Sequence, residues 1–269
     1  MRWPDFSAPS REVKPPADDP AVAGRMEAAL EAVGRGDYAL ALQVWGPLAH
    51  AGVPRAQNNV GACFANGLGV AADGSLALRW LTLAAEAGDP VGQRNLATLH
   101  FKGELVEPDP LLAARWYRAA AEQGDGESQD MLSWLLVEGE LIAPDYAEAR
   151  RWALAAAEQG IAPAMTRLGM FHHNALGVPR DVAAAAEWWR KAALQDDHDA
   201  QAMLGAAHHI GAGVARDAVA ALAWLRRADR GGSDLAKPFL AAAEAACTAE
   251  ERAAAERRAV EALSAKDAA

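Results

Sequence analysis

The sequence predicts an all-α fold, a right-handed α/α superhelical solenoid of helix-turn-helix repeats that are 36 residues long. Three observations predict it. Helix-forming residues, alanine and leucine above all, dominate the composition, and β-branched residues are sparse. Several residue types recur along the chain at one common spacing. Residues that start and stop helices fall at fixed places within that spacing.

Tryptophan gives the clearest column of the repeat, and aspartate, glycine and leucine keep the same spacing of 36 residues. The columns are Trp80, Trp116, Trp152, Trp188 and Trp224; Asp73, Asp109, Asp145, Asp181 and Asp217; Gly52, Gly88, Gly124 and Gly160; and Leu96, Leu132, Leu168, Leu204 and Leu240. Because independent residue types share one register, the chain is a tandem array.

One helix of each unit follows the aspartate. The carboxylate of Asp73 can accept backbone N–H groups as an N-cap and meets the positive end of the helix dipole. Apolar residues at helical spacing follow, Trp80 among them, and Gly88 supplies a left-handed stop. The sequence therefore predicts a helix between Asp73 and Gly88.

The other helix follows after a short turn. Asp89 and Pro90 are typical of an N-cap and a first-turn proline, and Gly103 ends the segment. Neither helix can bury its apolar face alone, so neighbouring units must stack on one another.

The stretch from Ala56 to Gly88 resembles the Sel-one-like repeat, a longer relative of the tetratricopeptide repeat. The matching residues elsewhere are Trp116, Tyr117, Ala120, Ala121, Glu122 and Gly124 for the end of the repeat, and Gly211, Gly213, Val214 and Asp217 for its middle. The resemblance recurs in five consecutive repeats, which cover roughly Gly34 to Gly232. It implies a non-catalytic adaptor that binds a partner protein or peptide on a concave surface lined by the first helix of each pair.

Several residues depart from the repeat pattern, and Phe64, His100, Leu136, His172 and His208 stand where the family has tyrosine. Leu105 and Leu141 replace the second glycine of the turn inside a pair, so we expect those turns to take a different path. Asp196 stands where glycine is usual at the end of a helix.

The ends of the chain differ from the array. We predict a disordered segment over residues 1–20, the solenoid over 21–246, and a capping helix and tail over 247–269. Proline and charged residues alternate in the first segment. In the last, Thr248 and Glu251 have the spacing of a capping box, and Arg252 to Leu263 is rich in arginine and glutamate, as a polar cap would be.

Charge and cysteine content exclude several classes. The net charge of −10, from 26 basic and 36 acidic residues, argues against nucleic acid and anionic membranes as partners. Cys63 and Cys247 are too far apart in the chain for a disulfide framework or a thiolate metal site. No apolar run has the length of a signal peptide or a membrane span, which favours the cytoplasm. The alanine- and arginine-rich composition favours a bacterial source.

Candidate partner-binding residues follow from the analogy with tetratricopeptide arrays. They are Asn58, Arg94, Thr98, Phe101, Lys102, Trp134, Glu138, Met170, His173 and His209. Trp134 with Arg94 nearby has the composition of a binding hot spot. The alternative is that Trp134 packs over a neighbouring repeat.

A histidine column gives a second hypothesis, a metal-binding or metal-sensing protein that uses His100, His172 and His208. Neighbouring residues on a helix point about 100° apart, so few imidazoles could face one site, and zinc requires three or four ligands. Half-buried histidines are the simpler interpretation. A third hypothesis is a self-associating scaffold; otherwise we expect a monomer or weak self-association. Motifs of catalysis such as G-x-S-x-G and H-E-x-x-H are absent, which predicts no enzyme and no cofactor.

Overall fold

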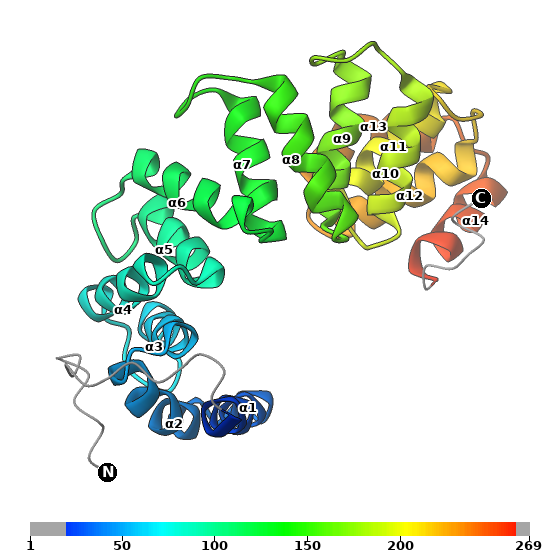
Figure 1. Cartoon of the computed structure of the whole chain (residues 1–269). Coiled ribbons are helices and arrows are strands. Elements are labelled where there is room, and N and C mark those ends of the chain that lie inside the picture. Colours follow the sequence, from blue (N-terminus) through cyan, green and yellow to red (C-terminus); the bar gives the residue numbers. More distant parts are fainter. Residues whose placement is uncertain (1–19, 262–269) are drawn as a thin grey trace. The chain divides into compact units, whose positions relative to one another are not determined.

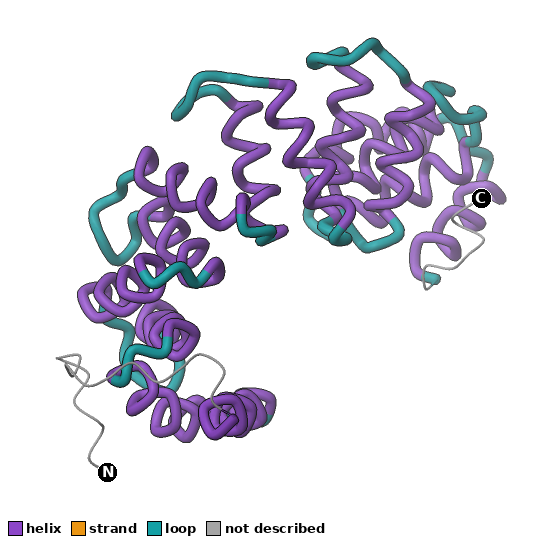
Figure 2. Tube along the Cα trace, in the orientation of Figure 1, coloured by secondary structure: helices purple, strands orange, loops and turns teal. Residues whose placement is uncertain are grey.

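The computed structural model describes residues 20–261, and every regular element in that part of the chain is helical (Figures 1 and 2). The elements are α1 (Pro20–Gly34), α2 (Tyr38–His50), α3 (Pro54–Asn66), α4 (Gly74–Glu86), α5 (Pro90–Lys102), α6 (Pro110–Glu122), α7 (Gly126–Glu138), α8 (Tyr146–Glu158), α9 (Ala162–Asn174), α10 (Val182–Ala193), α11 (His198–Ile210), α12 (Ala218–Arg230), the 3-10 helix η1 (Asp234–Ala236), α13 (Lys237–Ala245) and α14 (Ala249–Val260). The predicted all-α architecture of helix pairs is confirmed. Residues 1–19 and 262–269, which include most of the predicted disordered segment and the predicted tail, lie outside the described residues.

The described chain forms two compact units. Unit 1 holds residues 20–135 and 140–142, and unit 2 holds residues 136–139 and 143–261. In unit 1, α3 packs on α4, α5 packs on α6, and α3 lies beside α5. In unit 2, the same arrangement joins α9 with α10, α11 with α12, and α9 with α11. We call α3, α5, α7, α9 and α11 the first helices of the repeats, and α4, α6, α8, α10 and α12 the second helices.

The aspartate column caps the second helices as predicted. In each case the side-chain Oδ1 accepts the backbone N–H three residues on, at an N···O distance of 2.9–3.0 Å. Gly88 follows its helix with a left-handed φ of +87°. Asp196 adopts φ +64° in the place of that glycine, so the chain keeps the same stop with a different residue.

In the second helices, the column of residues directly after tryptophan is buried in every repeat. Its members are Leu81, Tyr117, Ala153, Trp189 and Leu225, and all are buried. Trp80 and Trp224 are buried as well, but Trp116, Trp152 and Trp188 are only half-buried. Trp188 is therefore not the core residue of its repeat, although it belongs to the tryptophan column. The ammonium of Lys191 lies 4.3 Å from the centroid of the Trp188 ring, whereas Trp189 fills the core and donates its indole N–H to the carbonyl of Thr166.

First and second helices cross closely at a column of small residues. A Cβ built on Gly61 would lie 2.8 Å from the Leu81 side chain, and one on Gly205 would lie 2.8 Å from Leu225. On Gly169 it would overlap the indole of Trp189. Glycine is thus required at these positions by close approach.

The turns that contain Leu105 and Leu141 differ from the others, as expected. The second glycine of the remaining turns has a left-handed φ at Gly69, Gly177 and Gly213, whereas neither leucine has a positive φ. The carbonyl of Leu105 instead lies against Gly74 at the start of α4, where any side chain would overlap it.

Helix α14 packs on α12 at the end of unit 2. Its capping box is present, because the Thr248 hydroxyl accepts the Glu251 N–H and the Glu251 carboxylate accepts the Thr248 N–H. Arg226 links the two helices through Glu256 at 3.0 Å. The helix begins at Ala249, directly after its N-cap Thr248.

Replacing Gly169 with alanine should lower the free energy of unfolding by about 2–3 kcal/mol, because the added methyl would displace the Trp189 indole from its site and break its hydrogen bond. Chemical denaturation monitored by circular dichroism measures this. Gly24→Ala is the control: a Cβ there meets nothing within 4 Å, so helix propensity should make it neutral or stabilising. Equal effects of the two changes would contradict the close crossing.

Ala175 ends α9 with a left-handed φ of +56°, where the corresponding Gly211 has φ +78°. Ala175→Gly should therefore stabilise the protein by about 1 kcal/mol, because a left-handed conformation costs alanine more than glycine. Gly211→Ala should destabilise it by a similar amount. Denaturation midpoints of both variants check the pair, and an unchanged Gly211→Ala protein would contradict the reason given.

Candidate functional site

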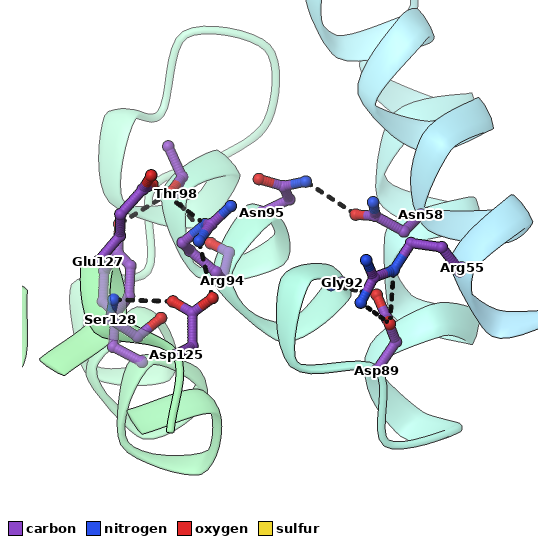
Figure 3. A network of polar contacts seen from close by, with 11 residues as sticks. Arg55, Asn58, Asp89, Gly92, Arg94, Asn95, Thr98, Asp125, Glu127 and Ser128 are labelled. Atoms are coloured by element: carbon purple, nitrogen blue, oxygen red, sulfur yellow. Dashed lines mark hydrogen bonds and ion pairs between the residues drawn. The ribbon is translucent and has the colours of Figure 1, made fainter. Parts of the chain in front are cut away.

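Aspartates at the start of first helices join neighbouring repeats of unit 1 (Figure 3). Asp89 accepts the Gly92 N–H of its own helix α5 and the guanidinium of Arg55 on α3, both at 2.8 Å. Asp125 accepts the Ser128 N–H of α7 at 2.9 Å and the guanidinium of Arg94 on α5 at 2.7 Å. Each carboxylate thus caps one first helix and binds an arginine on the first helix of the preceding repeat.

Unit 2 repeats this arrangement with a neutral donor. The Thr166 hydroxyl on α9 donates to Asp197, the N-cap of α11, at 3.0 Å. Each unit therefore has polar links between its neighbouring first helices, from α3 to α5 and α5 to α7 in unit 1 and from α9 to α11 in unit 2.

Hydrogen bonds and an ion pair within unit 1 occupy three of the predicted partner-binding residues. Asn58 is buried and accepts from the Asn95 amide at 2.7 Å, and Arg94 is bound by Asp125. The Thr98 hydroxyl bonds to the Arg94 carbonyl and lies 3.0 Å from the Tyr117 hydroxyl. Burial raises the pKa of that Tyr117 hydroxyl. All three predicted residues have structural roles, so they are poor choices for contacts with a partner.

Trp134 packs inside unit 1 against its neighbour. Its ring meets Phe101 edge to face, with centroids 5.8 Å apart and planes at 86°. Both are half-buried against the cluster that contains Ala97, Tyr117 and Leu135. Of the two interpretations of Trp134, the arrangement favours packing over a neighbouring repeat.

A pocket of about 100 Å³ opens between α3 and α5. It is lined by Ala62, Ala65, Asn66, Leu81, Asn95, Thr98, Leu99, Lys102, Glu104 and Leu105. Lys102, Asn66 and Glu104 are exposed, whereas Leu81 and Leu99 are buried. The pocket therefore has an apolar interior and a polar rim, the composition of a binding site. Of the predicted residues it contains Thr98 and Lys102.

The remaining predicted residues lie in unit 2. Glu138 is exposed, and Met170 and His209 are half-buried. His173 lies against Trp189, with ring centroids 5.4 Å apart. Their part in partner binding stays a prediction.

The histidine column forms no metal site in the described residues. His208 is held by the backbone, with Nδ1 3.2 Å from the Ala215 carbonyl oxygen, and burial lowers its pKa. The Nδ1 atoms of His100 and His172 are buried. No three His, Cys, Asp or Glu side chains of residues 20–261 gather where they could hold a metal ion.

The two cysteines are free and buried. Burial raises the pKa of the Cys63 thiol to about 11, so it stays protonated and unreactive near neutral pH. Within residues 20–261, the helices are too short or too polar for any of them to cross a bilayer.

Sequence reasoning missed Asn95, Glu104 and Leu105 as site residues. The departure of Leu105 from the repeat glycine is the available signal in the sequence.

Comparisons with known proteins agree on one family. The family model described as Sel1 repeat matches residues 54–89, 90–125, 126–161, 162–197 and 198–233. No curated protein matches. The crystal structure of a Sel1 repeat protein from Oxalobacter formigenes is similar at 27% identity and a TM-score of 0.77, over 87% of this chain and 96% of that one. The protein c5321, described as a protective antigen of uropathogenic Escherichia coli with an SLR fold, is similar at 25% identity and a TM-score of 0.60, over 92% of this chain and 62% of that one.

The ion pair of Arg94 and Asp125 should stabilise the stack by about 1–2 kcal/mol, between the values of exposed and buried pairs, because Asp125 is buried and Arg94 partly so. A double-mutant cycle with Arg94→Ala and Asp125→Asn measures the coupling by urea denaturation. Asparagine can still cap α7, which separates the pair from the cap. Strictly additive effects would contradict the link between repeats.

Proposed function

Because the chain belongs to the Sel1 repeat family, we propose that it is a non-catalytic adaptor that binds a partner protein or peptide on the face formed by its first helices. Repeat proteins of this kind generally mediate protein–protein interactions, and stacked helix pairs give them extended binding surfaces. The proposal deepens that general role by naming the face.

The pocket between α3 and α5 carries the proposal. It combines buried leucines with exposed groups that could contact a partner, and it lies on the first helices. Among the predicted residues, Lys102 is the best placed, because it is exposed on the rim and makes no ion pair with any described residue. Met170, His173 and His209 would extend the same kind of face in unit 2.

The proposal also places the protein in the cytoplasm of a bacterium, as a monomer or a weakly associating chain. The acidic charge supports a partner other than nucleic acid or an anionic membrane.

The test compares two charge reversals, one on a first helix and one on a second helix. Lys102→Glu changes the rim of the pocket on α5, and Arg115→Glu changes an exposed residue of the second helix α6. Affinity capture from the native cytoplasm, quantified by mass spectrometry, should recover one partner with the wild type and with Arg115→Glu. Lys102→Glu should recover at least tenfold less of it.

Circular dichroism must show that both variants remain folded. Loss of the partner with Arg115→Glu and its retention with Lys102→Glu would contradict binding on the first helices, and would assign it to the second helices.

A further inference from the structure

The pocket between α3 and α5 has the size of one side chain. Its volume of about 100 Å³ equals about three water molecules at ~30 Å³ each. The deepest lining residues, Leu81 and Leu99, are buried, and Ala62 and Ala65 add two further apolar surfaces. A branched aliphatic side chain would fill such a space and displace water from apolar walls.

Leu105 makes this pocket different from the general repeat. The corresponding residues are Gly69, Gly177 and Gly213 in three other repeats, which offer no side chain. Leu105 lines the pocket and is 40% exposed, so a large apolar side chain stands there at the cost of contact with water. Gly74 permits this position of the loop, because it leaves room for the Leu105 carbonyl.

The rim offers both hydrogen-bond donors and acceptors. The amide nitrogens of Asn66 and Asn95 donate to the Ala62 carbonyl and to the Asn58 side chain, whereas their side-chain oxygens accept no hydrogen bond from the described residues. Lys102 adds a donor and Glu104 an acceptor, and neither makes an ion pair with a described residue. The two charges are opposite, so the rim has no net preference for an acidic or a basic ligand.

An extended peptide backbone matches this rim. It presents a free N–H and a free C=O at each residue, whereas the backbone groups of a helix are already satisfied along its length. A helix would leave the rim groups to water and gain only the apolar contact.

We infer that the pocket between α3 and α5 is an anchor site for one aliphatic side chain of an uncharged partner segment bound in extended conformation, with Leu105 as the residue that sets this specificity. The inference rests on the proposed function and names the chemistry of the partner at that site.

The test uses a phage-displayed library of random linear peptides, selected on the folded full-length protein. Selection should yield a consensus with leucine, isoleucine or methionine at one position and no charged residue beside it. A synthetic consensus peptide should bind Leu105→Gly at least tenfold more weakly in calorimetry, because the wall of the pocket is gone. Leu141→Gly is the matched control and should bind normally.

One further protein variant and one modified peptide keep the test decisive. If Leu105→Gly does not fold, Ala65→Met fills the pocket from α3 and should weaken the same peptide as strongly. N-methylation of the backbone on either side of the aliphatic residue should also weaken binding, because it removes N–H donors that an extended segment uses.

A consensus without an aliphatic position, equal affinity for wild type and Leu105→Gly, or a helical bound peptide in NMR spectra would each overturn the inference. Failure to select any peptide would overturn it too. The proposed function is judged separately, because the comparison of Lys102→Glu with Arg115→Glu reports on a native partner of any conformation.

Discussion

The close crossing of the two helices in each repeat is the constraint on which the structure depends. Gly61 and Gly205 allow α3 and α11 to approach Leu81 and Leu225. The same position is Gly169 where the opposite residue is Trp189, so the larger side chain fits only because the first helix has none. Once the pairs are fixed in this way, the outer face of each pair can stack on the next.

The stacking then decides which polar residues remain available. Asp125 caps α7 by accepting the Ser128 N–H. The same carboxylate also forms the ion pair with Arg94. Asn58 is likewise bound by Asn95. On the first helices of unit 1, the groups around Lys102 are exposed beside an apolar hollow. The candidate site lies next to the residues that hold the repeats together, and it shares Asn95 and Thr98 with them.

The helices could be predicted from the sequence because their limits depend on local chemistry: Asp73 caps an N–H three residues away, and Gly88 stops the helix that follows. The site could not be predicted in the same way. Arg94 is bound to a residue 31 positions away, a contact that depends on how the repeats stack. The tryptophan column was equally misleading, because Trp116, Trp152 and Trp188 are only half-buried whereas the residue after each tryptophan is buried, and a shift of one position rotates a helix by about 100°. The pocket required a loop conformation that Leu105 and Gly74 determine together.

The central claim is that a partner binds on the first helices at the pocket of unit 1. Site-specific photo-crosslinking in living cells tests it most directly, with p-benzoyl-phenylalanine placed at the exposed position of Asn66 or at that of Arg115. The account predicts a covalent adduct with one partner from position 66 and none from position 115. An adduct from position 115 together with none from position 66 would contradict it.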